Sequence, residues 1–361
     1  MPRCRLALAL LTICCTSAAV PAAPAAAPSD GDVIAAYVVS RVGDAGAPDD
    51  KPKRAREGDA VTLYAVAAVR AHGKTIYLAD VDPISIGGRK LATHPWSDAP
   101  ALAIAWNRIE PAVASMSNEA SGQFAFEPID YRATAIDGAG GHTSIPADVR
   151  PTLTPDHGDG AGTMRFQVVI TAGDRTVASA GADARRGRGS GGLTDAVHRI
   201  SIRRDDTYLG YLTELYGQPY IWASAGSTDA THQSERLEGA DCADFVVYGA
   251  RRMGLRVPYT WTEDLPRFAK TLAKGAPDDK GIYRDAHGDP IRFTGVGDLV
   301  LFPRHVGVLV EDRGTKGVLD DQDVIMHALF DTPKEVRIAD SGYDGLPISV
   351  LRWPFARAAA R

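Results

Sequence analysis

The chain has 361 residues, of which 45% are hydrophobic and 24% are charged, and its formal net charge is −5. This composition is typical of a globular protein with a sizeable core, and the length favours two domains. Since no excess of lysine and arginine is available to neutralise phosphates, the charge balance argues against a nucleic-acid partner.

Residues 1–26 are predicted to be a removable secretory signal peptide. Arg3 and Arg5 form a basic start, residues 6–15 form an apolar run too short for a transmembrane helix, and small residues fill 17–27. No later segment reaches the length of about 18 apolar residues that a membrane helix needs. The mature protein is therefore expected to be exported, to the periplasm or the medium, without a transmembrane segment.

Residues 33–202 are predicted to form a β-rich accessory domain. Segments with alternating apolar and polar residues are typical of strands, and turn residues separate them; they lie at 60–66, 75–78, 163–170 and 176–180. The pattern fits a β-sandwich, with an immunoglobulin-like arrangement as one candidate, or a small barrel. We place the domain boundary near 202–205.

Residues 205–356 have a different pattern, which predicts an α+β domain. One helix is expected over 207–216 and a second over 242–253, the latter with Asp241 as its N-cap. Strands are expected at 298–302, 305–311, 324–330, 336–338 and 348–353. The predicted fold class is thus α+β for this half, preceded by the β-rich domain.

Cys242 is the one cysteine expected to remain in the mature chain, because the other three lie within the signal. A lone thiol in an exported protein has no intramolecular disulfide partner, so it is either an inert buried side chain or a reactive group. In the first turn of a helix, backbone N–H groups and the helix dipole favour the thiolate and can stabilise an oxyanion.

Two histidines lie on predicted strands further along the chain. His305 starts an apolar strand on which Gly307 shares its face and leaves room beside the imidazole, which suits a general base. His327 lies within another apolar strand, where a buried imidazole needs a hydrogen-bond partner, and orienting His305 would supply one. Each residue alone could be structural, and only the combination with Cys242 indicates thiol chemistry.

Five strings in this half resemble the NlpC/P60 family of papain-like cysteine peptidases and amidases. They are Gly-Gln-Pro-Tyr-Ile-Trp at 217–222, Asp-Cys-x-x-Phe-Val at 241–246, Gly-Asp-Leu-Val-Leu-Phe at 297–302, His-Val-Gly-Val at 305–308 and Met-His-Ala at 326–328. The resemblance covers roughly 208–353. It implies a papain-like fold in which the helix that carries the nucleophile packs on an antiparallel sheet.

The resemblance also implies roles for single residues. Cys242 matches the nucleophile, His305 the base and His327 the residue that orients the base. Tyr220 and Asp241 match residues that contact the substrate, with helix capping as an alternative role for Asp241. The implied reaction is hydrolysis of an amide in a peptidoglycan stem peptide, often between D-glutamate and a diamino acid, through a thioester and without a cofactor.

The chain departs from the family pattern near the nucleophile and in two loops. Ala243 and Asp244 stand where Ser-Gly is usual, and Asp244 is expected either to oppose thiolate formation or to bind a cationic substrate. Polar loops at 226–238 and 311–323 are expected to narrow the specificity. The aspartates of the second loop lack the spacing of an EF-hand, which predicts a solvated loop rather than a calcium site.

Three alternatives stay open. Cysteine and histidine are zinc ligands, although no paired spacing supports a zinc site here. A domain with the same residues could bind wall peptides without cutting them. The thioester could also pass its acyl group to an amine, which would make the protein an acyltransferase; the sequence does not indicate an oligomeric state.

Overall fold

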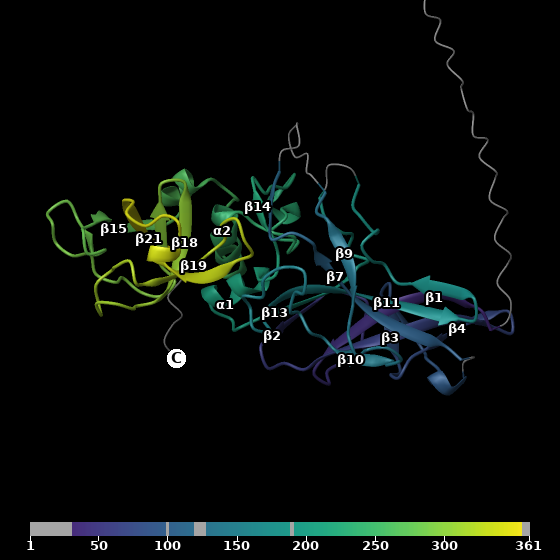
Figure 1. Cartoon of the computed structure of the whole chain (residues 1–361). Helices are drawn as coiled ribbons and strands as arrows, with labels where there is room; N and C mark the ends of the chain where they lie inside the picture. Colours follow the sequence, from purple (N-terminus) through teal and green to yellow (C-terminus); the bar gives the residue numbers. More distant parts are fainter. Residues whose placement is uncertain (1–30, 99–100, 119–127, 188–190, 356–361) are drawn as a thin grey trace, which may run out of the picture.

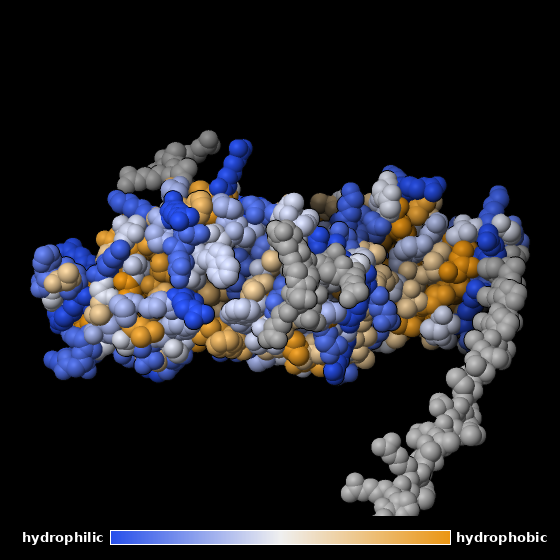
Figure 2. Space-filling view, turned by 90° about the horizontal axis from the view of Figure 1, so that it is seen from above, coloured by the Kyte–Doolittle hydropathy of each residue, from blue (hydrophilic) through white to orange (hydrophobic). Residues whose placement is uncertain are grey.

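The computed structural model describes residues 31–98, 101–118, 128–187 and 191–355. The predicted signal peptide at 1–26 lies outside these ranges. Figure 1 shows two lobes arranged end to end, the N-terminal lobe in purple to teal and the C-terminal lobe in green and yellow, and Figure 2 shows the same elongated outline from above. Within the described ranges, no helix has both the length and the apolar character needed to cross a membrane.

The N-terminal lobe consists of two sheets that face each other. The first contains β1 (Val33–Val42), β3 (Val61–Ala71), β4 (Lys74–Leu78) and β10 (Ser144–Pro146). The second contains β2 (Lys53–Arg56), β7 (Ala103–Pro111), β9 (Tyr131–Ala135), β11 (Gly162–Ala172), β12 (Arg175–Ala178) and β13 (His198–Arg203). Leu63, Trp106 and Phe166 are fully buried in the core that the two sheets share.

Alternation explains why β3 is so deeply buried. Its odd-numbered residues, such as Leu63 and Val69, belong to the core between the sheets. Its even-numbered residues Tyr64 and Val66 pack on the other face, against the hairpin of β5 (Ile84–Ile86) and β6 (Arg89–Leu91). Strands with one residue set per face are the expected result of such a pattern. The strands predicted from alternation in this half are confirmed as β3, β4, β11 and β12.

The C-terminal lobe is built on a seven-stranded antiparallel sheet in the order β16-β15-β21-β17-β18-β19-β20. Its strands are β15 (Lys270–Pro277), β16 (Tyr283–Arg284), β17 (Leu299–Phe302), β18 (His305–Glu311), β19 (Val324–His327), β20 (Lys334–Arg337) and β21 (Ile348–Arg352). The helix α2 (Cys242–Arg252) lies against this sheet, because Phe245 and Val246 share a core with Val306 and Val308 of β18.

The remaining helices are short. The C-terminal lobe begins with α1 (Tyr208–Leu212), which continues as the 3-10 helix η2 (Thr213–Leu215). Further 3-10 turns of the described residues are η1 (Trp96–Asp98), η3 (Asp229–Thr231), η4 (Thr262–Arg267) and η5 (Ile338–Asp340).

The predicted fold class, α+β with a papain-like second domain, is wrong. Strands account for 40% of the structure and helices for 11%, and the sheet is curled. Among the described residues, α1 has five residues and α2 has eleven. Part of the error lies between α2 and β17, where no strand was expected and β15 and β16 form. The sequence of β15 does not alternate cleanly, and its pairing with β21 holds it in the sheet.

The two lobes are joined by backbone pairing and by buried polar contacts. The strand β8 (Ser115–Ser117) of the first half pairs in parallel with β14 (Tyr220–Trp222) of the second. Arg165 of β11 is buried and donates to the Gln218 side chain at 3.1 Å and to the Leu237 carbonyl at 2.8 Å. Since buried donors need such partners, these bonds fix the segments before α2 against the N-terminal lobe.

Candidate active site

Cys242 is the first residue of α2, and Asp241 is the N-cap of this helix. The Asp241 carboxylate accepts hydrogen bonds from the backbone N–H groups of Ala243 and Asp244, each at 2.9 Å. The predicted N-cap is therefore confirmed. It places the thiol in the first turn and commits one Asp241 oxygen to the helix rather than to a ligand.

His305 and His327 meet on neighbouring strands of the C-terminal sheet. His305 begins β18 and His327 ends β19, and His305 Nε2 lies 2.9 Å from His327 Nδ1. Both side chains are buried, with exposed fractions of 0% and 2%. The other nitrogen of each ring has no hydrogen-bond partner among the described residues. His305 Nδ1 is thus the nitrogen left to exchange a proton with the thiol.

The thiol lies at the start of β18. The backbone N–H of Val306, the residue after His305, donates a hydrogen bond to the Cys242 sulfur. Tyr220, the first residue of β14, is on the same side, because the charges of Cys242 and Asp241 both act on its hydroxyl. The structure therefore brings together Cys242, His305, His327 and Tyr220, which were predicted from separate strings.

Tyr343 belongs to the same group, although no sequence pattern indicated it. Its ring stacks on His305 with a centroid distance of 4.5 Å and an interplanar angle of 20°. Burial, followed by the charge of Cys242, raises the pKa of Tyr343 above its ordinary value, so its hydroxyl is near the sulfur. Tyr343 lies in the turn between η5 and β21, and only the folded chain brings this turn to His305.

The predicted thiolate is not the resting state of the site. Burial raises the pKa of the Cys242 thiol far above its usual value, with the Asp241 charge adding to the effect and the Val306 N–H only partly opposing it. Burial also lowers the pKa of His305 to about 3 and that of His327 to about 4. At neutral pH the site thus holds a neutral thiol and a neutral imidazole.

This electrostatic arrangement predicts the pH dependence of alkylation. The rate constant for iodoacetamide should rise about tenfold per pH unit from pH 7 to pH 10 without levelling off, because only the thiolate reacts and its fraction keeps growing below a raised pKa. Urea-unfolded protein is the control, in which the rate should level off above a pKa near about 8.5. A rate independent of pH between 5 and 8 would instead reveal a preformed thiolate–imidazolium pair.

Asp244 has the first of its two predicted roles, because its charge adds to the rise in the pKa of the Cys242 thiol and so opposes the thiolate. It is buried, it accepts a hydrogen bond from the Ser224 hydroxyl, and it lies 3.5 Å from His232 Nε2. Burial and then the Asp241 charge raise the pKa of Asp244 well above its ordinary value. Because Ser224 Oγ also accepts the Asp241 N–H at 3.0 Å, Asp244 connects the loop before α2 to the start of that helix.

The loop at 311–323 is not solvated as predicted. Asp320 and Asp323 are buried, with exposed fractions of 4% and 0%. Asp320 accepts the N–H of Thr315 at 2.7 Å, and Asp323 accepts that of Arg313 at 2.8 Å. These carboxylates fold the loop onto itself. Across the described parts of the chain, no group of three or more His, Cys, Asp or Glu side chains is placed to hold a metal ion.

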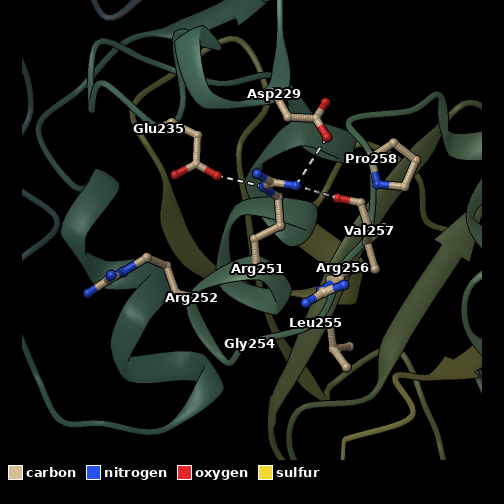
Figure 3. A pocket seen from close by; sticks show the side chains of 9 residues that line it. All are labelled: Asp229, Glu235, Arg251, Arg252, Gly254, Leu255, Arg256, Val257 and Pro258. Carbon is tan, nitrogen blue, oxygen red and sulfur yellow. Dashed lines mark hydrogen bonds and ion pairs between the residues drawn. The ribbon is translucent and has the colours of Figure 1, made fainter.

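A cavity of about 430 Å³ lies at the opposite end of α2 from Cys242. Figure 3 shows Arg251 at its centre, where the guanidinium binds Glu235 at 2.6 Å, Asp229 at 3.2 Å and the Val257 carbonyl at 2.8 Å. At 1.5 Å per helical residue, Cys242 is about 15 Å away along the axis. The cavity is therefore separate from the thiol, and Arg251 fixes the loop before α2 at the far end of the helix.

Comparisons with protein-family models, with curated proteins and with solved structures found no match. The function therefore has to follow from the side chains at the start of α2, at the ends of β18 and β19, and from the resemblance of the sequence strings. A nucleophile, a base and a residue that orients the base are the groups that acyl transfer requires.

Proposed function

We propose that the protein is a cysteine hydrolase of the NlpC/P60 type, which cleaves amide bonds in peptidoglycan stem peptides. The observation that carries the proposal is the thiol at the first turn of α2, with the Val306 N–H on its sulfur and the hydrogen-bonded His305–His327 pair beside it. The papain-like fold that the resemblance implied does not hold. The proposal therefore depends on the residues and their geometry.

In the proposed reaction His305 Nδ1 takes the thiol proton as the sulfur attacks the amide carbon. A carbon–sulfur bond forms, and the negative charge on the carbonyl oxygen is stabilised by the Cys242 backbone N–H, which Asp241 does not use. The imidazolium then gives its proton to the leaving amine, and the carbon–nitrogen bond breaks to leave a thioester. Water, deprotonated by His305, hydrolyses the thioester, while His327 keeps the His305 ring in position.

The proposed substrate fits the proposed location. Stem peptides lie outside the inner membrane, and a signal peptide at 1–26 would deliver the enzyme there, to the periplasm or the medium. No cofactor is needed, because the thiol, the imidazole and water complete the chemistry.

Mass spectrometry of peptidoglycan fragments tests this function. Purified fragments incubated with the wild-type protein should yield pairs of products whose summed mass exceeds that of the parent by one water. The same incubation with Cys242→Ala should leave the fragments intact. Identical product profiles for the two proteins would rule out thiol hydrolysis, and the product masses would identify the bond that is cut.

A non-catalytic peptide-binding protein is the second candidate, and one observation favours it. The thiol is only 7% exposed, and burial keeps it protonated. A binding protein would retain the fragments in equilibrium dialysis without changing their masses. An acyltransferase would instead give a product with the mass of an added amine, so the same spectra separate all three outcomes.

A further inference from the structure

Two arginines stand opposite each other on the second sheet of the N-terminal lobe. Arg165 of β11 and Arg199 of β13 are partners in the antiparallel register. Phe166 and Ile200, the residues that follow them, belong to the core between the two sheets, so both arginines lie on the other face of their sheet. In such a pair the Cβ atoms are about 5 Å apart, and like charges repel each other. We call Arg165 and Arg199 the facing arginines.

The protein partners of the facing arginines are neutral. Arg165 is buried and donates to the Gln218 side chain and the Leu237 carbonyl, as described above. Arg199 donates to the Arg236 carbonyl. Within the described ranges, neither guanidinium forms an ion pair with a carboxylate, and the buried Nε of Arg199 has no hydrogen-bond partner. Since buried cations and donors are costly without partners, a small group that accepts hydrogen bonds and carries negative charge would stabilise this pair.

Glu238 is a buried carboxylate in the same region, and its charge acts on Arg165. Both of its oxygens are engaged by other groups. Oε1 lies 3.4 Å from Arg186 Nε, and Oε2 accepts the backbone N–H of Gly192 at 3.3 Å. Glu238 therefore pairs with Arg186, and it does not relieve the repulsion between the facing arginines through an ion pair of its own.

A small cavity lies among these side chains. The facing arginines line it together with Arg186 and Glu238, and its volume is about 10 Å³. This is about the space that one water molecule or one ion of similar size requires, so a phosphate group or an organic ligand does not fit. Burial and then the charge of Arg165 lower the pKa of Arg199 to about 10, which is the direction expected for a cation beside another cation.

We infer that this cavity binds a chloride ion between the facing arginines. Chloride is a compact anion that accepts hydrogen bonds from several N–H groups, and here it would accept one from Arg199 Nε and offset the repulsion across the strand pair. A water molecule could accept the same hydrogen bond, but it would leave the repulsion in place. The ion would strengthen the contact between the lobes, because the guanidiniums that hold it also bind the carbonyls of Arg236 and Leu237 in the C-terminal lobe.

Thermal unfolding at constant ionic strength tests the chloride site. In mixtures of sodium chloride and sodium gluconate, the melting temperature of the wild-type protein should rise by about 2 °C for each tenfold increase in chloride, because the ion binds only the folded state. Arg199→Gln should lose this dependence. In gluconate alone it should unfold at the wild-type temperature or above, because it removes the repulsion. Arg89→Gln, which removes an exposed arginine of β6, should respond to chloride as wild type does.

The linewidth of the chloride NMR signal gives a direct readout of binding. It should be broader with wild-type protein than with the same concentration of Arg199→Gln, and added bromide should narrow it by competition. If Arg199→Gln does not fold, Arg199→Lys replaces it, and the loss of the Nε donor should weaken both chloride effects.

A wild-type melting temperature that does not depend on the chloride fraction, or equal linewidths for the wild-type and variant proteins, would overturn the inference and assign the cavity to water. Both measurements are made without substrate, so either result would leave the proposed hydrolase intact.

Discussion

Cys242→Ala is expected to lower kcat on wall peptides by about 10⁵-fold or more, while the free energy of unfolding changes by no more than about 1 kcal/mol. In the proposed reaction the sulfur is the only atom of this side chain that forms a bond with the substrate, and its removal leaves a small gap at the end of α2. The Asp241 cap does not involve the thiol, so the helix should keep its start. Single-turnover kinetics and urea unfolding of the same preparation measure the two effects.

The two histidines provide graded controls for this experiment. His305→Ala should approach the loss seen for Cys242→Ala, because His305 is the proposed base. His327→Ala should retain more activity, because it removes only the 2.9 Å bond that orients the His305 ring. Turnover by Cys242→Ala at the wild-type rate, or a larger loss for His327→Ala than for His305→Ala, would contradict the assigned roles.

The sequence indicates the residues of the site better than it indicates their charge state. The residue strings identified Cys242, His305, His327 and Tyr220, which the fold brings together. The ionised thiol followed from a local feature, the helix dipole, which is worth up to about 2 kcal/mol, or about 1.5 pKa units. Burial can shift a pKa by about 3 to 5 units. The burial of the Cys242 sulfur depends on its neighbours β18, Tyr343 and Tyr220. These come from distant parts of the chain, so no local sequence pattern predicts this burial.

In the fold, too, features set by local sequence were predictable and those set by distant contacts were not. The strands β3 and β11 were predictable from alternation over long segments, and β18 was predictable because it is an apolar run. The pairing of β8 with β14 was not, since each has three residues and they lie about a hundred positions apart. The α+β class was predicted from the pattern of 205–356 and from the family resemblance, but the two helices of that segment are short, with five residues in α1 and eleven in α2. His232 and Ser224 were missed because they lie in a loop that packs inward.

Glu214, in η2, connects the two lobes through ion pairs, which its place in the sequence did not predict. Its side chain is fully buried, and Arg54 of β2 lies 2.9 Å and Arg252 of α2 3.2 Å from the carboxylate. Arg203 of β13 approaches at 3.7 Å, and the Tyr248 hydroxyl donates a hydrogen bond. One carboxylate therefore pairs with arginines of the second sheet of the N-terminal lobe and of the helix that carries the thiol.

Glu214→Ala is expected to lower the free energy of unfolding by about 3 kcal/mol, as measured by urea denaturation. Removing one partner of a buried ion pair costs about 3–5 kcal/mol, and we take the lower end because Arg54 and Arg252 keep 28% and 26% exposure and can be hydrated. Glu263→Ala, which changes an exposed glutamate in η4, should stay within about 0.5 kcal/mol of wild type.

The same variant tests whether the N-terminal lobe supports the site. If the Glu214 cluster couples the lobes, its loss should shift the single cooperative transition by about 3 kcal/mol, and activity should fall together with that transition. The reason is that Arg165, β8 and Glu214 all hold segments between 213 and 237, which precede α2 in the chain. A single transition shifted by less than about 1 kcal/mol would show that apolar packing and the β8–β14 pair join the lobes without the ion cluster.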